Sequence, residues 1–82
     1  MSKAHVIVYS RPGCHLCDEA KEAIASAGCE DFVLDETNIE TSRDLMLKYQ
    51  FDIPVVLING VEAFRHRLDA DRFRELIAGS VP

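Results

Sequence analysis

An abrupt change of hydrophobic pattern near the start of the chain restricts the fold more than any other feature. The run Val6-Ile7-Val8-Tyr9 is continuously apolar, which predicts a strand over residues 5–9 that is covered on both faces. Ser10-Arg11-Pro12-Gly13 then breaks that run. Beyond the break, apolar side chains recur at helical spacing up to Gly28, a residue typical of a helix C-terminus. This helical stripe consists of Leu16, Ala20, Ala23, Ile24 and Ala27. The pattern predicts a strand, a tight turn and a helix.

The middle of the chain predicts a second strand and a second helix. Residues 32–34 are apolar and indicate a short strand. We expect it to run parallel to the first strand, because a helix of about four turns separates the two. Thr41 or Ser42 can cap the next helix. The apolar side chains of that helix are Leu45, Met46 and Tyr49.

The last part of the chain predicts a hairpin and a closing helix. Residues 55–58 are apolar and are followed by Asn59-Gly60, the strongest two-residue hairpin signal, which places an antiparallel strand at 61–65. Asp69 is a suitable N-cap for a final helix that Gly79 is expected to close. Its inward side chains are Ala70, Phe73, Leu76 and Ile77.

The 82 residues leave room for one small domain, which we expect to span residues 1–82. A content of 48% hydrophobic and 28% charged residues is sufficient for a packed core and argues against disorder. The predicted order β-α-β-α-β-β-α describes an α/β fold, in which helices flank a four-stranded mixed sheet.

Charge and cysteine usage narrow the partners and the compartment. With 14 acidic and 9 basic residues the net charge is −5, so we expect neither a nucleic-acid partner nor an anionic membrane surface. The apolar runs are far shorter than the roughly 20 residues that cross a bilayer. Three cysteines, an odd number, do not form the framework of a secreted disulfide-rich domain. We therefore expect a cytosolic protein whose closely spaced cysteines have redox or metal chemistry.

The chemistry is expected at Arg11-Pro12-Gly13-Cys14-His15-Leu16-Cys17. Two cysteines at i and i+3 in the first turn of a helix lie on one face, close enough to form a disulfide. Backbone N–H groups and the helix dipole favour a thiolate at Cys14, and Arg11 and protonated His15 can add to this effect. In such motifs the thiol pKa commonly falls to about 3.5–7.5, from about 8.5 for a free cysteine.

The two thiols are expected to have different roles. Cys14 attacks a substrate disulfide, and the less exposed Cys17 then resolves the mixed disulfide that forms. The alternative is a pair of ordinary buried cysteines, but this does not explain why the pair follows a buried strand and a Pro-Gly turn.

A metal site is a separate alternative. Cys29 falls at the far end of the same predicted helix, about 18 Å from Cys14 at 1.5 Å per residue, so one chain is not expected to close a tetrahedral site. An iron-sulfur cluster or metal ion shared between two chains through Cys14 stays open. Cys29 itself is expected to be a small buried hydrophobic residue.

Positive charge gathers at Arg65-His66-Arg67 in a mostly acidic chain. Arg65 and Arg67 either belong to a solvated loop or form a dock for an anionic group of a substrate or partner. The acidic pair Asp35-Glu36 has no ligand spacing and is expected to be solvated surface.

These motifs together resemble the glutaredoxin-like family of the thioredoxin-fold superfamily, and the resemblance covers essentially the whole chain. It rests on residues 5–9, Cys14-His15-Leu16-Cys17, Ile53-Pro54-Val55 and Asn59-Gly60. The stretch 9–20 is most similar to a branch of small glutaredoxin-like proteins whose role is poorly defined.

The resemblance implies specific roles. Cys14 matches the nucleophile of the family, Cys17 the resolving cysteine, and Pro54 a cis-proline beside the active-site sulfurs. The backbone of Ile53 would then pair with an extended substrate segment. Arg11 matches a position where glutaredoxins that use glutathione often have lysine.

Two departures bear on the substrate. Where those glutaredoxins have a Gly-Gly-x-x-Asp loop for glutathione, this chain has Arg65-His66-Arg67-Leu68-Asp69, in which Arg65 or Arg67 can substitute by charge. His15 between the cysteines is similar to strongly oxidising family members, in which a histidine favours the reduced thiolate.

The resemblance and the residues together predict a thiol-disulfide oxidoreductase with no bound organic cofactor. Its expected substrates are protein disulfides or glutathione mixed disulfides, and its expected reductant is a thiol system, with glutathione one candidate. We expect it to act as a monomer. A redox-inactive interaction domain of the same fold is the remaining alternative.

Overall fold

The structure is a computed structural model that describes residues 3–80. Its elements are β1 (Ala4–Ser10), α1 (His15–Ser26), β2 (Phe32–Asn38), the short 3₁₀ helix η1 (Ile39–Thr41), α2 (Arg43–Tyr49), β3 (Val55–Ile58), β4 (Val61–Arg65) and α3 (Ala70–Ser80). This is the predicted order with η1 added. Within residues 3–80, no helix has the length and apolar character needed to cross a membrane.

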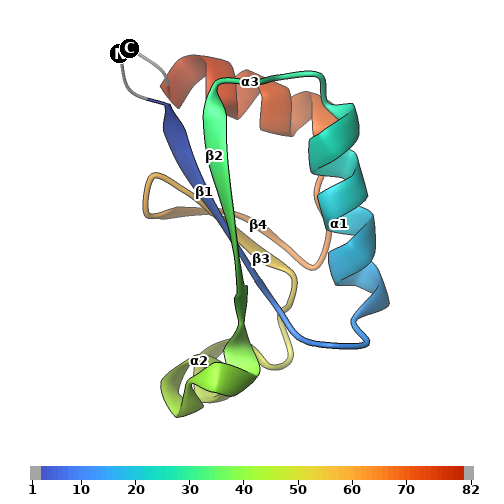
Figure 1. Ribbon diagram of the computed structural model, residues 1–82, viewed down its shortest axis with the longest axis vertical. Coiled ribbons are helices and arrows are strands. Elements are labelled where there is room, and N and C mark those ends of the chain that lie inside the picture. The colour runs from blue at the N-terminus through green and yellow to red at the C-terminus, as the bar shows by residue number, and fades with distance from the viewer. Residues whose placement is uncertain (1–2, 81–82) are drawn as a thin grey trace.

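The four strands form one mixed sheet in the order β2-β1-β3-β4. β1 lies in the centre, parallel to β2 and antiparallel to β3, and β4 returns antiparallel to β3. The antiparallel register pairs Tyr9 with Val55. As a result, the end of β1 and the start of β3 meet at one end of the sheet, where α1 also begins (Figure 1).

The main core lies between the sheet and the helices α1 and α3. Phe73 of α3 is fully buried, and its ring meets Phe32 edge to face with centroids 5.4 Å apart. The core residues come from β1, α1, β3 and α3, and they are Ala4, Val6, Val8, Ile24, Ala27, Val56, Ile58, Phe73 and Ile77. The predicted helical stripes therefore face inward.

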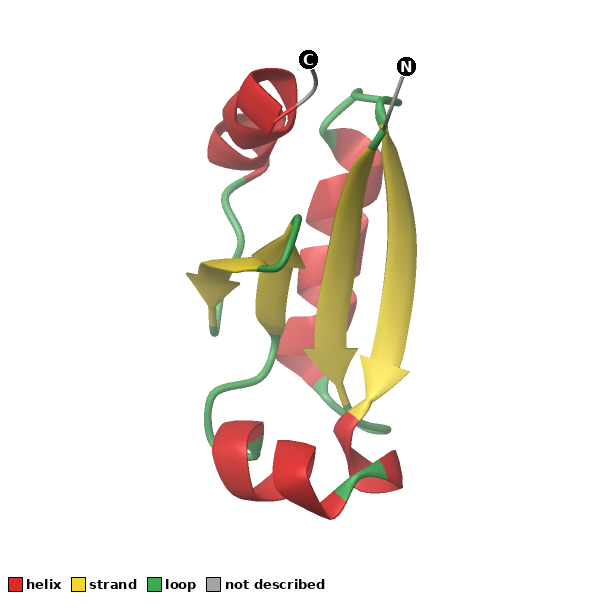
Figure 2. Cartoon of the chain, turned by 90° about the vertical axis from the view of Figure 1, so that its left-hand side faces the viewer, coloured by secondary structure: helices red, strands yellow, loops and turns green. Residues whose placement is uncertain are grey.

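A second, smaller core holds α2 to the sheet. Figure 2 shows α2 beyond the ends of β1 and β2 rather than over the sheet. Its buried residues are Ile39, Tyr49 and Val55, and the ring of Tyr9 stacks on that of Tyr49 with centroids 4.9 Å apart. This cluster fixes the segment that connects α2 to β3.

The turns follow the sequence signals. Asn59 and Gly60 both have positive φ, 51° and 83°, which is the hairpin geometry that Asn-Gly favours. Gly28 follows the helix C-cap with φ 76°. Ser42, one of the two predicted caps, accepts a hydrogen bond from the backbone N–H of Leu45.

Two predicted boundaries are wrong. β2 extends beyond 32–34 to Asn38, because an exposed edge strand pairs through its backbone with β1 and does not need apolar side chains. Gly79 does not close the last helix but lies within α3, which continues to Ser80. Asp69 caps that helix as predicted, with its carboxylate accepting from the N–H of Asp71 at 3.0 Å.

Candidate active site

The two cysteines lie at the start of α1, where Cys14 is the N-cap and Cys17 belongs to the first turn. They form a disulfide across 5.2 Å between Cα atoms. The backbone N–H of Cys17 also donates to Cys14 Sγ at 3.2 Å. Gly13 makes this entry possible, because its φ of 79° is a left-handed conformation that glycine adopts without strain.

The two sulfurs differ in accessibility. Cys17 is 1% exposed and belongs to the buried side of α1, whereas Cys14 is half-buried. Negative charge on Cys14 Sγ would face the unpaired N–H groups of the helix start, which are the positive end of the helix dipole. The arrangement can therefore stabilise an accessible Cys14 thiolate while Cys17 remains protected.

His15 and Arg11 flank the pair but are engaged outside it. The imidazole of His15 is exposed and its Nε2 lies 3.6 Å from the carboxylate of Glu19. The guanidinium of Arg11 extends toward η1 and lies 3.3 Å from the carboxylate of Glu40. Among residues 3–80, neither side chain forms a hydrogen bond with a sulfur.

The peptide bond between Ile53 and Pro54 is cis, as the family resemblance implies. Pro54 is fully buried directly before β3. Because Tyr9 pairs with Val55, Pro54 lies beside the end of β1, and β1 ends four residues before Cys14. In the part of the chain that the structure describes, the N–H and C=O of Ile53 form no hydrogen bond. These two groups are therefore available to an extended segment of a partner.

The segment after β4 holds this loop in place. The backbone N–H of His66 donates to Pro54 O at 2.9 Å and to Asp52 O at 3.3 Å. The Asp52 carboxylate lies 3.1 Å from the Arg65 guanidinium and 3.6 Å from the His66 imidazole. His66 has φ 70°, a left-handed conformation that is uncommon for any residue other than glycine.

Arg65 and Arg67 differ in what they can still bind. Arg65 is bound by Glu62, at 2.7 Å and 3.2 Å, and by Asp52. The hydrogen bonds with Arg65 lower the pKa of Glu62, and they raise that of Arg65. The Arg67 guanidinium has no ion-pair partner within residues 3–80. Arg67 is therefore the better candidate for an anion dock.

Arg67 borders a hollow beside the first turns of α1. The hollow has a volume of about 180 Å³ and is lined by Leu16, Glu19, Ala20, His66, Arg67 and Leu68. Leu16, which lies between the two cysteines in the sequence, and the 66–68 segment line the same hollow. The 66–68 segment therefore lies near the first turns of α1. Arg67 thus shares this hollow with the first turns of α1, whereas Arg65 is directed toward Asp52.

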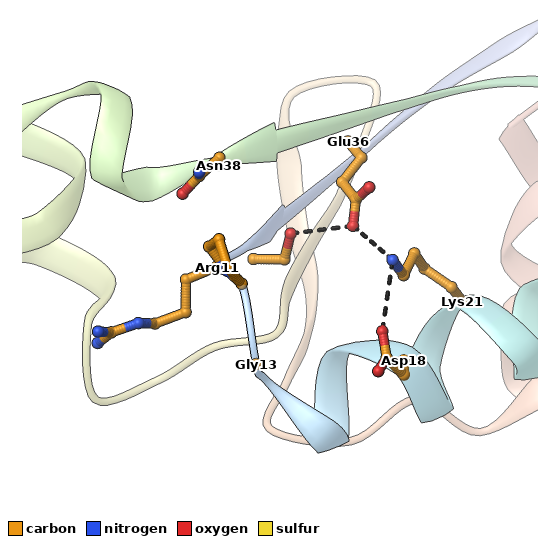
Figure 3. A pocket seen from close by; sticks show the side chains of 8 residues that line it. Arg11, Gly13, Asp18, Lys21, Glu36 and Asn38 are labelled. Atoms are coloured by element: carbon orange, nitrogen blue, oxygen red, sulfur yellow. Dashed lines mark hydrogen bonds and ion pairs between the residues drawn. The ribbon is translucent and has the colours of Figure 1, made fainter.

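A polar cluster behind the Pro12-Gly13 turn was not predicted. Figure 3 shows Lys21 between two carboxylates, and its Nζ lies 2.8 Å from Glu36 and 3.5 Å from Asp18. The hydroxyl of the buried Ser10 donates to Glu36 at 3.0 Å. The hydrogen bond from Lys21 lowers the pKa of Glu36, and the same bond raises that of Lys21.

The acidic pair Asp35-Glu36 lies on the surface as predicted, but each residue also has a partner. Both residues are exposed, yet Asp35 pairs with the His5 imidazole at 2.5 Å and Glu36 ties β2 to α1. The Lys21–Glu36 pair could not be predicted because the expected strand ended at residue 34. In the structure β2 continues through Glu36, and the carboxylate of Glu36 reaches Lys21 on α1. Cys29, predicted to be buried, is half-buried and packs against the main core.

Comparisons of sequence place the chain among known proteins. A family model described as "Glutaredoxin-like domain (DUF836)" matches residues 5–78. The "Glutaredoxin-like protein YDR286C homolog" of Dictyostelium discoideum is 38% identical over 71 residues. That match covers 78% of this chain and 66% of the relative, so the chain spans slightly less than two thirds of that protein.

Solved structures with a similar fold cover most of the chain. The crystal structure of the protein XcR50 from X. campestris is 30% identical, with a TM-score of 0.74 over 94% of this chain and 99% of that one. The solution structure of Ne2328 from Nitrosomonas europaea is 26% identical, with a TM-score of 0.78 over 94% of each chain.

A mutant thioredoxin from Halobacterium salinarum aligns over 99% of this chain and 80% of its own length, with a TM-score of 0.66. At a sequence identity of 17%, this structural similarity shows the fold alone, and the fold is the predicted thioredoxin fold. With the family match over residues 5–78, the chain belongs to the glutaredoxin-like family.

Proposed function

We propose that the chain is a thiol-disulfide oxidoreductase that cycles between the Cys14–Cys17 disulfide and the dithiol. The observation that carries the proposal is the N-cap position of Cys14, whose sulfur accepts the N–H of Cys17 at 3.2 Å. A donor already aimed at this sulfur stabilises its anionic form without reorganisation.

The reaction proceeds by two exchanges. The Cys14 thiolate attacks a substrate disulfide, forms a mixed disulfide and releases one substrate sulfur as a thiolate, which takes up a proton. Cys17 then loses its proton and attacks Cys14 Sγ, which releases the second substrate sulfur. The substrate gains two electrons and two protons, and an external thiol reductant restores the Cys14–Cys17 dithiol.

The remaining groups are assigned to substrate binding. Ile53 offers its free N–H and C=O to an extended segment, next to Pro54. Arg67, which has no ion-pair partner within residues 3–80, offers a cation beside the first turns of α1, and this supports disulfides with a nearby carboxylate, in proteins or in glutathione mixed disulfides. Arg11, His15 and Arg65 have weaker support, because acidic neighbours already pair with their side chains.

The proposed working form is a cytosolic monomer without a bound organic cofactor. A thiol reductant system supplies its electrons, and glutathione is one candidate.

Two serine variants test the mechanism. In an insulin-reduction assay, run separately with glutathione and with thioredoxin reductase as the reductant, Cys14→Ser is expected to abolish turnover. Cys17→Ser is expected to accumulate a mixed disulfide on Cys14, which mass spectrometry detects. Turnover that survives in Cys14→Ser contradicts the mechanism.

The same protein preparations distinguish the proposed redox function from the alternative of a metal ion or cluster shared between two chains. If protein purified without oxygen is colourless, free of iron and zinc, and active, the redox function stands. Stoichiometric metal that is lost in Cys14→Ser, with no turnover in the wild type, favours a cluster shared between two chains instead.

A further inference from the structure

The outer side of α2 carries a surface that neither core uses. It consists of Arg43, Leu47 and Phe51, which we call the α2 patch. Leu47 is 68% exposed and Phe51 is 83% exposed. Arg43 and Leu47 are one turn apart on α2, and the chain is still helical at the C-cap Gln50, so Phe51 follows one turn after Leu47. Exposed leucine and phenylalanine side chains at adjacent turns form a contiguous apolar surface, and such surfaces mark candidate interaction sites.

The patch adjoins the substrate-binding backbone. Phe51 precedes Ile53 by two residues, a span of at most about 7 Å. α2 and the starts of α1 and β3 lie at the same end of the molecule (Figure 1). A segment that pairs with the free N–H and C=O of Ile53 therefore passes within reach of the Phe51 ring.

Phe51 is exposed on a fixed turn. The N–H of Asp52 donates to Tyr49 O at 2.8 Å, and the Asp52 carboxylate is bound by Arg65 at 3.1 Å. Tyr49, on the other side of Phe51 in the chain, is buried and stacked on Tyr9. Because both neighbouring segments are anchored, little conformational freedom is lost when Phe51 binds a partner.

The charge of the patch identifies its partner. The Arg43 guanidinium has no ion-pair partner within residues 3–80, although the chain has 14 acidic residues. The ammonium group of Lys48 lies over the Tyr49 ring, 5.2 Å from its centroid, and leaves a second positive charge on the same helix. Asp44 is exposed next to Arg43, so the three charged residues of α2 (Arg43, Asp44 and Lys48) carry a net charge of +1. A net positive charge beside exposed apolar side chains complements a segment that carries both apolar and acidic residues.

We propose that the α2 patch docks the disulfide substrate, and that this substrate is a protein segment with a bulky apolar residue near its cysteine and acidic residues further along. This inference rests on the proposed function and names its substrate class. It makes protein disulfides, rather than small disulfides, the substrates that the chain binds through contacts beyond the sulfur.

Turnover of matched peptides tests the proposal. The probe is a peptide disulfide with leucine beside the cysteine and two glutamates further along, compared with bis(2-hydroxyethyl) disulfide. Phe51→Ala and Leu47→Ala are each expected to lower kcat/KM for the peptide roughly tenfold and to leave the small disulfide unchanged. Val61→Ala removes a similarly exposed apolar residue, 69% exposed on β4, and is expected to change neither rate.

Charge reversal supplies the second comparison. Arg43→Glu is expected to slow reduction of the glutamate peptide and to speed reduction of the same peptide with lysines in place of the glutamates. The proposal is overturned if the patch variants slow both substrates equally, if they slow neither, or if Arg43→Glu does not distinguish the two peptides.

Binding without turnover keeps this inference separate from the proposed function. A version of the peptide with serine in place of cysteine is titrated into the oxidised wild-type protein and followed by NMR. Shifts at residues 43–53 that weaken in Phe51→Ala support docking, even if the wild type reduces no disulfide. Absence of such shifts overturns the docking surface. Shifts there that depend on protein concentration alone identify a contact between two copies of the chain, and this also overturns it.

Discussion

Cys14 caps the helix whose dipole it uses, so one residue joins local structure to the proposed chemistry. The sequence was sufficient to predict this, because a Pro-Gly break between a buried strand and a helical stripe places the next residue at a helix start. The left-handed conformation of His66 could not be predicted, since histidine does not mark such positions as glycine does. The pairing of Arg65 with Asp52 was equally hidden, because those residues meet only through the fold.

Gly13 and Gly79 provide a matched test of the turn before Cys14. An added Cβ would meet no atom within 4 Å at either position, but only Gly13 has a positive φ, of 79°. Gly13→Ala is therefore expected to destabilise the fold by about 1–2 kcal/mol. Gly79→Ala, within α3, is expected to stabilise it by roughly 0.5–1 kcal/mol. Urea unfolding measures both, and equal effects of the two substitutions would contradict the role given to Gly13.

At the scale of elements, the predicted order was confirmed and the errors lie at the edges. β2 was predicted too short because its second half, Asp35 to Asn38, is polar and exposed, and only its ladder with β1 defines it as a strand. Hydrophobic periodicity reports burial rather than backbone pairing, so it finds central strands better than edge strands. Because that half of the strand was not predicted, the link between β2 and α1 through Glu36 and Lys21 was not predicted either.

That link predicts a dependence of stability on pH. The pKa of Glu36 is lowered from 4.5 in the folded protein, chiefly by the hydrogen bond from Lys21. Ionised Glu36 therefore adds to the free energy of unfolding at pH values above its pKa in the unfolded chain, and this stabilisation disappears as the pH falls through its lower pKa in the folded protein. Glu36→Gln is expected to cost roughly 1 kcal/mol or less at pH 7, because the pair is half-exposed. The difference from wild type should vanish in acid.

Glu22→Gln is the control for this measurement. Glu22 lies exposed on α1 with no partner among residues 3–80, so its substitution should leave the unfolding free energy unchanged across the same pH range. A difference between wild type and Glu36→Gln that persists at the acid end, or that grows there, would show that the carboxylate does not stabilise the fold through Lys21.

At the scale of the whole molecule, the proposed site draws on three segments far apart in the chain. The start of α1 supplies the dithiol, the loop before β3 supplies Ile53 and Pro54, and the 66–68 segment supplies Arg67. The sequence identified each segment by its own motif, and the family resemblance implied that they meet. The fold adds which groups have no partner within residues 3–80, and this favours Arg67 over Arg65 for the proposed anion dock and draws attention to the α2 patch.

The proposed mechanism requires Cys14 to be a thiolate near neutral pH. The direct measurement is the rate of iodoacetamide alkylation of Cys14 against pH, by stopped flow in the Cys17→Ser variant, with the alkylated residue identified by mass spectrometry. The rate is expected to reach half its maximum below about pH 7.5, because the helix start stabilises the anion. A midpoint near 8.5, the value of an ordinary thiol, would contradict the account.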